Sequence, residues 1–228
     1  MMQSRIVVAV WLIAAAAVIV SFPDYATLPA MVVTVMGMLE LWELSGSSGL
    51  SGMSKGQRSG WPYWAYGGLF FFGIGMALFI LSAKQSLAIW LLAGAVTTDI
   101  GAFLVGKGVT TVYRRFGRKP AALARKVSPN KTWWGAVGGA VASWATMVLL
   151  MRPLGLPLLS PSVAAMILVP ITAILGDLLE SWLKRYAGVK DSGRFLGSHG
   201  GILDRLDGIV AVFALPGTIA LIAIHCTA

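Results

Sequence analysis

The chain has 228 residues, of which 57% are apolar (Ala, Val, Ile, Leu, Met, Phe, Trp, Tyr or Cys) and 12% are charged, with a net charge of +9. Its mean hydropathy is +0.79. Since a soluble domain is roughly 25% charged, this composition excludes an ordinary cytosolic protein and predicts a polytopic membrane protein. The single cysteine, Cys226, allows no intramolecular disulfide.

Seven apolar segments of about 17 residues or more are long enough to cross a bilayer as helices. They cover residues 6–22, 28–44, 62–82, 86–105, 132–151, 161–181 and 205–225. We expect the first segment to be a retained anchor, because no small-x-small cleavage site stands near Ser21-Phe22-Pro23. The predicted fold class is therefore all-α, a polytopic integral membrane bundle of about seven transmembrane helices.

Basic residues divide unequally between the two sides of these spans. On the side of the N-terminus lie 16 of the 18 Lys and Arg residues, whereas only Lys84 and Arg152 lie on the other side. Because cytoplasmic loops carry an excess of Lys and Arg, we expect a cytoplasmic N-terminus in a multi-pass protein of the inner (cytoplasmic) membrane. This rule accounts for most of the positive charge, so the lipid bilayer is an expected partner and nucleic acid is not.

Eight of the nine acidic residues fall on the same side, in the ends of spans or in the loop after residue 181. They are Glu40, Glu43, Asp99, Asp177, Glu180, Asp191, Asp204 and Asp207. A charged side chain at the bilayer centre costs about 2.5–3.5 kcal/mol on insertion scales, so acids inside spans need a cation, a partner or water. The pattern predicts a polar, cation-holding cavity that opens to the cytoplasm.

The densest polar stretch covers residues 176–207. Four of its side chains are spaced i, i+3, i+4 and i+7, which places them on one helical face: Asp177, Glu180, Ser181 and Lys184. Asp204 and Asp207 are spaced i, i+3 at the start of the next span. Carboxylates at two helix ends suit a hard cation such as Mg²⁺, and nearby Lys and Arg can hold phosphate. The alternative is a set of interfacial ion pairs with basic side chains reaching the headgroups.

Three sequence patterns carry a resemblance to a known family. They are Ser181-x-Leu183-Lys184-Arg185-x4-Lys190-Asp191-x-Gly193-x2-Leu196-Gly197-x-His199-Gly200-Gly201-Ile202-x-Asp204-Arg205-Leu206-Asp207, Thr98-Asp99-x-Gly101-Ala102-Phe103-x-x-Gly106, and Ser128-Pro129-Asn130-Lys131-Thr132-Trp133. From about residue 90 onward the chain resembles phosphatidate cytidylyltransferases (CDP-diacylglycerol synthases), with a weaker similarity at Leu39-Glu40. It departs from the family at Trp134, where a Glu is usual, and at Gly197-Ser198, where Pro-Gly is usual.

The resemblance implies the reaction of CTP with phosphatidate to give CDP-diacylglycerol and pyrophosphate, with Mg²⁺ as cofactor and a second cation left open. On this basis we expect the metal to be held by Asp177 and Asp204, supported by Glu180 and Asp207. The catalytic residues would be Lys184, Arg185, Lys190, Asp191, His199 and Arg205. Substrate binding would fall to Asp99, Lys131, Ser181, Gly200 and Gly201. We also expect a homodimer.

The domain division follows from these assignments. Residues 1–85 would be N-terminal transmembrane helices, and residues 86–228 a catalytic transmembrane domain with cytoplasmic loops at 106–131 and 182–204. The first loop has eight basic residues and no acid, which either sets topology alone or also attracts anionic lipid or nucleotide. Gly135 and Gly139, spaced i, i+4, predict a close helix contact.

Three other functions remain open from the sequence. The substrate of a cytidylyltransferase could be another membrane lipid phosphate, such as an archaeal ether lipid. A transporter or channel would need polar residues at mid-membrane and on both sides, and the outer side of this chain has almost none. An inactive scaffold is favoured slightly by Trp134, because the family usually has a Glu at this position.

Overall fold

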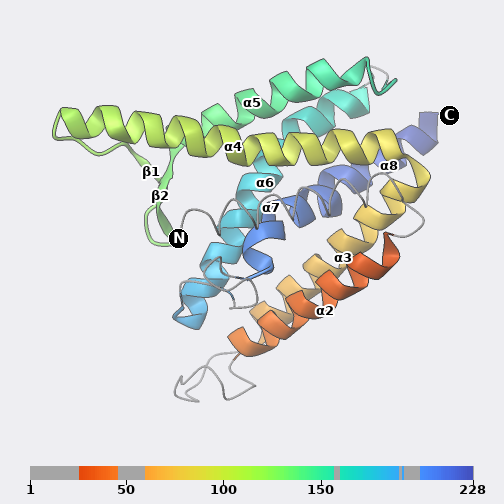
Figure 1. Ribbon diagram of the computed structural model, residues 1–228, viewed down its shortest axis with the longest axis horizontal. Coiled ribbons are helices and arrows are strands. Elements are labelled where there is room, and N and C mark those ends of the chain that lie inside the picture. Colours follow the sequence, from red (N-terminus) through yellow and green to blue (C-terminus); the bar gives the residue numbers. More distant parts are fainter. Residues whose placement is uncertain (1–25, 46–59, 157–159, 190–191, 193–200, 228) are drawn as a thin grey trace.

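The structure, a computed structural model, describes residues 26–45, 60–156, 160–189, 192 and 201–227 (Figure 1). Its elements are α2 (Thr27–Leu44), α3 (Trp61–Ala83), α4 (Gln85–Arg115), β1 (Ala122–Ala124), β2 (Ser128–Thr132), α5 (Trp133–Met151), α6 (Ser160–Ala187), α7 (Leu203–Val212), the π-helical turn η3 (Phe213–Gly217) and α8 (Thr218–Thr227). Six helical segments in this part of the chain are long and apolar enough to cross a membrane. The predicted helical membrane class is thus confirmed, while the first predicted span, 6–22, lies outside the described residues.

The surface and the core of the bundle are both apolar. Large side chains such as Leu28 and Leu149 are 68% and 74% exposed, as expected where lipid is the solvent. Inside the bundle, the fully buried Trp90 donates its indole N–H to the carbonyl of Met147 on α5 at 2.7 Å. A buried polar atom is therefore satisfied across the helix interface, as a membrane interior requires.

Helices α4 and α5 lie side by side along most of α5 (Figure 1). A Cβ added to Gly139 on α5 would lie only 2.6 Å from the carbonyl oxygen of Thr98 on α4. The backbones approach too closely for any side chain at this position, which confirms the small-residue helix contact predicted from Gly135 and Gly139.

Helix α4 is longer than its apolar segment. Its 31 residues span about 46 Å at 1.5 Å per residue, against about 30 Å for the hydrocarbon core. Residues 106–115, predicted as the start of a loop, are therefore helical. The prediction was wrong here because hydropathy marks where apolar residues stop, and a basic segment without proline can continue the helix.

Helix α4 ends at a left-handed glycine. Gly117 has φ 66°, its N–H donates to the carbonyl of Arg114 at 3.1 Å, and the N–H of Arg118 donates to Tyr113 at 3.0 Å. This pair of bonds is the Schellman motif, which reverses the chain at a helix end. The reversal sends the chain back along α4.

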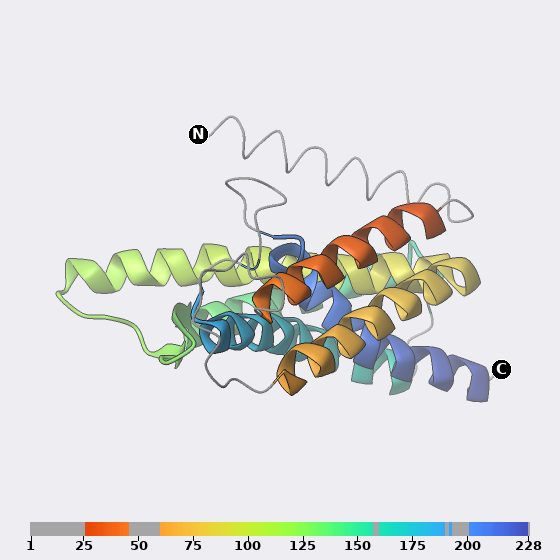
Figure 2. The same cartoon turned by 90° about the horizontal axis from the view of Figure 1, so that it is seen from below.

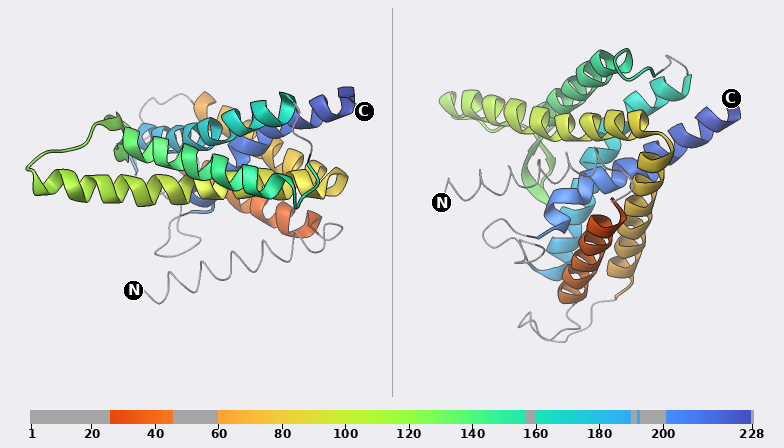
Figure 3. Two further views of the ribbon diagram at one scale, coloured as in Figure 1. Left: turned by 90° about the horizontal axis from the view of Figure 1, so that it is seen from above. Right: turned by 45° about the vertical axis from the view of Figure 1, so that its right-hand side comes forward.

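A short antiparallel hairpin follows, with Ala122 paired to Thr132 and Ala124 to Ser128. It was not foreseen in the all-α prediction, since its strands have three and five residues and lack strand-like alternation. Thr132 then caps α5 by accepting the N–H of Gly135 at 3.0 Å. We call residues 106–132 the α4–hairpin arm; Figures 2 and 3 show the far end of α4 and the returning chain projecting beyond the other helices.

The last two spans also differ in detail from the prediction. Helix α6 continues to Ala187, so residues 182–187 of the expected loop 182–204 are helical. The predicted span 205–225 is interrupted by the π-helical turn η3, which contains Pro216. Proline has no N–H to donate and displaces the helical hydrogen-bond ladder, which accounts for the wider turn.

Candidate active site

Three carboxylates from α6 and α7 lie close together inside the bundle. Asp177, Glu180 and Asp207 each offer one oxygen, and these three oxygens lie within 4.8 Å of one another. Glu180 is 1% exposed and Asp207 is 9% exposed. We call this group the carboxylate cluster.

The cluster forms because α6 and α7 touch through their backbones. A Cβ added to Gly176 would lie 2.5 Å from the carbonyl oxygen of Asp207, so glycine alone permits this approach. The spacing i, i+3 places Asp177 and Glu180 on one face of α6, and the contact at Gly176 turns that face toward α7. Sequence spacing thus set the face, and helix packing chose its partner.

Lys184 links the cluster to the start of α7. Its Nζ lies 2.6 Å from Oε2 of Glu180 and 2.5 Å from Oδ1 of Asp204. Oδ2 of Asp204 accepts the N–H of Gly201 at 2.8 Å and that of Ser192 at 3.4 Å. Asp204 is therefore engaged by an ammonium group and two backbone donors, whereas Asp177 is grouped with Glu180 and Asp207.

One oxygen of the cluster has no hydrogen-bond partner in the part of the chain that the structure describes. Oε1 of Glu180 is buried and accepts no hydrogen bond from any described residue. A buried carboxylate oxygen left without a donor is costly, and a cation would satisfy it. The donor set of three carboxylates is the kind that hard divalent cations prefer.

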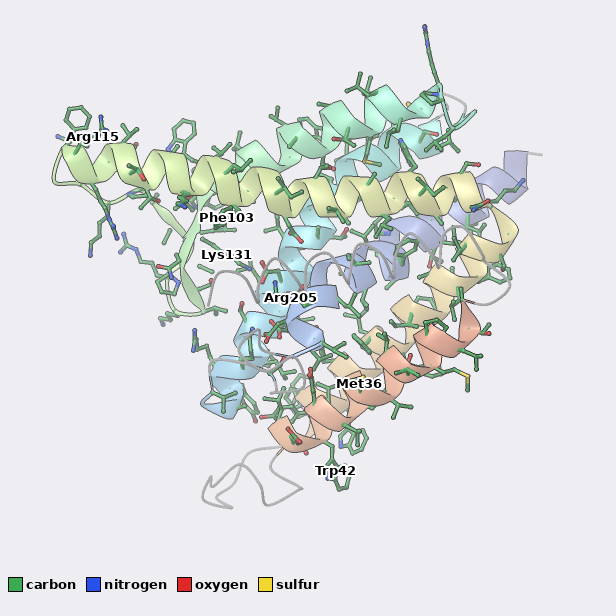
Figure 4. All side chains as sticks on the ribbon, in the orientation of Figure 1. Met36, Trp42, Phe103, Arg115, Lys131 and Arg205 are labelled. Atoms are coloured by element: carbon green, nitrogen blue, oxygen red, sulfur yellow. The ribbon has the colours of Figure 1, made fainter. Side chains whose placement is uncertain are left out.

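Lys131 brings the hairpin to this site. It comes from β2 and forms an ion pair with Asp177 on α6, and Figure 4 shows it between the hairpin and α6. Lys131, Asp177 and Asp99 of α4 line one cleft of about 1360 Å³. The structure thus brings together three residues that the sequence placed on separate elements.

Of the remaining predicted site residues, four are described by the structure and four are not. Arg185 donates to the carbonyls of Val127 and Val189 at 3.3 and 3.2 Å, and Arg205 is exposed on α7. Ser181 is half-buried on α6, and Gly201 is buried before α7. Four other residues with a predicted role lie outside the described residues: Lys190, Asp191, His199 and Gly200.

Glu40 of α2 is a member of the site that the sequence did not assign. It is 0% exposed, and its carboxylate accepts the N–H groups of Ile202 at 2.7 Å and Leu203 at 3.0 Å. The hydroxyl of Ser192 also donates to it, at 3.4 Å. The sequence signals were its place among the acids of one side and the weak similarity at Leu39-Glu40, and neither pointed to α7.

Glu40 does for α7 what a capping side chain does for its own helix. The first N–H groups of a helix have no partner within it, and a carboxylate there is favoured by both hydrogen bonding and the helix dipole. Glu40 binds the start of α7 at Ile202, 162 residues away in the chain, and it thereby positions Asp204 and Asp207, which α7 carries.

Comparison with known proteins identifies a family and several relatives of this chain. Residues 55–224 match the model of the cytidylyltransferase family. The phosphatidate cytidylyltransferase of Brucella suis biovar 1 (strain 1330) is 40% identical over 167 residues, which are 68% of this chain and 55% of that protein. Phosphatidate cytidylyltransferase 4, chloroplastic, of Arabidopsis thaliana is 44% identical over 124 residues, covering 54% of this chain and 29% of that protein.

A further relative is the phosphatidate cytidylyltransferase of Mycobacterium leprae (strain TN), which is 38% identical over 122 residues, or 53% of this chain and 36% of that protein. This chain spans about half the length of the Brucella protein. The family match covers every residue of the carboxylate cluster as well as Lys131 and Lys184, and about three quarters of the chain. The chain belongs to the cytidylyltransferase family.

Proposed function

We propose that this protein transfers a cytidylyl group from CTP to phosphatidate, giving CDP-diacylglycerol and pyrophosphate, at the cytoplasmic side of the inner membrane. The family match and the names of the relatives support this reaction. The observation that carries it is the carboxylate cluster, with oxygens of Asp177, Glu180 and Asp207 within 4.8 Å of one another.

The reaction exchanges one phosphoanhydride bond for another. An oxygen of the phosphatidate phosphate attacks the α-phosphorus of CTP, the bond from that phosphorus to the bridging oxygen breaks, and pyrophosphate leaves with this oxygen. Both substrates are anions that repel each other. The protein's contribution is to position them and to offset their charge.

The cluster fits Mg²⁺, which would be held by Asp177, Glu180 and Asp207. When bound, Mg²⁺ would supply positive charge to phosphate oxygens. Lys184 fixes the Glu180 carboxylate by its ion pair at 2.6 Å, so this ligand is held in place before substrate arrives. We retain Asp204 as a further proposed ligand, at the other end of the Lys184 bridge.

The phosphates of the substrates would be held by cations around the cluster. Lys131 enters the cleft beside Asp177, and Arg205 lies exposed on α7, one position after Asp204. Figure 4 shows both side chains in the region between α4 and α7. We further propose that the active form is a homodimer.

The direct test is an assay of the purified protein with CTP, phosphatidate and Mg²⁺. We expect release of pyrophosphate together with formation of CDP-diacylglycerol, and no release when phosphatidate is omitted. Other lipid phosphates, with dCTP beside CTP, complete the substrate panel. If a folded preparation released no pyrophosphate with phosphatidate of any chain length, the proposal would be rejected.

Substitution of a cluster residue tests the site itself. Asp177→Asn should lower turnover by about 100-fold or more, as expected for loss of one preorganised charged group. We expect Mg²⁺ to raise the melting temperature of the wild-type protein and Asp177→Asn to remove this rise. Glu43→Gln, which removes an acid of α2 outside the cluster, is the matched control and should change neither. Retention of both properties in Asp177→Asn would exclude this carboxylate as a ligand.

A further inference from the structure

The cleft beside the carboxylate cluster continues well beyond it, along the α4–hairpin arm. On α4 its lining residues run from Asp99 to Arg114, a distance of about 22 Å along the helix. They recur three or four residues apart and so form a stripe on one helical face. The hairpin provides the facing wall, and Asp177 of α6 lies on the lining as well.

The charge along this cleft is strongly positive. Six cations line it: Lys107, Arg114, Arg118, Lys119, Arg125 and Lys131. Its two acids are Asp99 and Asp177, and Asp177 is already paired with Lys131. Within the described ranges, the other five cations form no ion pair with a carboxylate. Only two acids of the chain, Asp24 and Asp191, fall outside those ranges. Two carboxylates could not neutralise five cations, so the cleft has a net positive charge.

The cations first expected to hold phosphate are in part engaged elsewhere. Lys184 bridges Glu180 and Asp204 at 2.6 and 2.5 Å, which uses its charge inside the site. Arg185 donates to two backbone carbonyls and thereby ties the end of α6 to the hairpin turn at Val127. By contrast, five cations of the arm that line the cleft form no ion pair with a carboxylate of the described residues: Lys107, Arg114, Arg118, Lys119 and Arg125.

Resting on the function proposed above, we propose that the arm's cleft is a polyphosphate site. Its end at Asp177 holds the β- and γ-phosphates of CTP, and its outer part takes up the pyrophosphate released after transfer. The α-phosphate would react beside Asp177, and the released pyrophosphate would pass outward along the cleft, past Lys107, to Arg114, Arg118 and Arg125. The polyphosphate carries the negative charge of CTP, and Arg binds phosphate oxygens with two parallel N–H donors.

The geometry favours a soluble polyphosphate over membrane headgroups. Helix α4 is about 16 Å longer than a hydrocarbon core, so its last residues carry the cleft away from the bilayer interior. The cations line a concave surface between α4 and the hairpin, whereas headgroup binding requires only a flat basic face.

The chain offers a matched pair of variants for the test. Arg114→Gln with Arg125→Gln removes two charges from the cleft lining, whereas Arg115→Gln with Lys126→Gln removes two charges from the adjacent positions, which do not line it. Figure 4 shows Arg115 at the far end of α4. Both double variants have the same net charge, so a general electrostatic effect would act on them equally.

The measurement is equilibrium binding of radiolabelled pyrophosphate to full-length protein in nanodiscs of phosphatidylcholine, with Mg²⁺ and without phosphatidate. The cleft variant should bind pyrophosphate at least about tenfold more weakly, since two charge-assisted bonds are lost. Product inhibition by added pyrophosphate should weaken by a similar factor, while the KM for phosphatidate stays unchanged. The control variant should stay within about twofold of wild type.

Equal affinities in the two variants would overturn the polyphosphate site. So would a cleft variant that binds pyrophosphate normally but changes its KM for phosphatidate when phosphatidylglycerol is added, since that result assigns the cleft to lipid headgroups. If wild-type protein bound pyrophosphate as expected but formed no CDP-diacylglycerol, the proposed function would be contradicted and the polyphosphate site would not.

Discussion

Glu40 connects α2 to the start of α7 through a single carboxylate. Replacing it by Ala would leave the N–H groups of Ile202 and Leu203 buried without an acceptor, at about 1–3 kcal/mol for each. Glu40→Gln keeps one acceptor oxygen and should be milder. We expect Ala to lower the melting temperature clearly, and Gln to keep most of the fold.

A positioning role predicts more than lost stability. At a temperature where Glu40→Gln is folded, we expect the Mg²⁺ concentration for half-maximal activity to rise while KM for CTP stays near wild type, since α7 carries Asp207. Glu43→Gln again serves as the control. A Glu40→Gln enzyme with unaltered Mg²⁺ dependence would show that Glu40 stabilises the fold alone.

Lys184 and Lys131 differ in the surroundings of their ion pairs. The Lys184 side chain is 14% exposed and serves two carboxylates, whereas Lys131 is 25% exposed and serves one. Lys184→Met should therefore destabilise by about 3–5 kcal/mol, the range for removing one partner of a buried pair, and Lys131→Met by less. Thermal denaturation in detergent compares them, with Lys184→Arg as the charge-preserving control. Equal losses would contradict this ranking.

At the scale of elements, the contact of α6 with α7 at Gly176 holds the carboxylate cluster together. Gly176→Ala would place a Cβ 2.5 Å from the carbonyl oxygen of Asp207 and force the helices apart. We expect a large loss of activity and of Mg²⁺-dependent stabilisation. Gly68→Ala is the control, because a Cβ there meets nothing within 4 Å and alanine favours the helix by about 1 kcal/mol. If Gly176→Ala kept the activity and the Mg²⁺-dependent stabilisation of the wild type, the carboxylate cluster would not depend on the close contact of α6 with α7.

At the scale of the whole molecule, the orientation in the membrane is a separate prediction. With Cys226 replaced by Ser, Lys126→Cys should react with a membrane-impermeant maleimide only from the cytoplasmic side, and Arg152→Cys only from outside. The reason is the segregation of 16 of 18 basic residues to one side. Labelling of both positions from the same side would refute the orientation, and intact and inverted vesicles provide the comparison.

The predicted spans were located well because hydropathy accumulates residue by residue along the chain. Five predicted segments from 28–44 to 161–181 fall within or nearly coincide with described helices. The prediction failed where local composition does not determine the backbone conformation. These places are the basic end of α4, the hairpin between Ala122 and Thr132, and the π-helical turn at Pro216.

The sequence by itself determined that this is a membrane protein with acids on one side and a shared face for Asp177 and Glu180, because composition and helical spacing are local properties. The cytidylyltransferase family was indicated separately, by the resemblance of the motifs between Thr98 and Asp207. Only the tertiary structure decided which acids meet. Asp207 joins the cluster, Asp204 pairs with Lys184, and Glu40 reaches α7. Those choices depend on the rotation and close approach of packed helices, which arise from contacts between residues far apart in the chain.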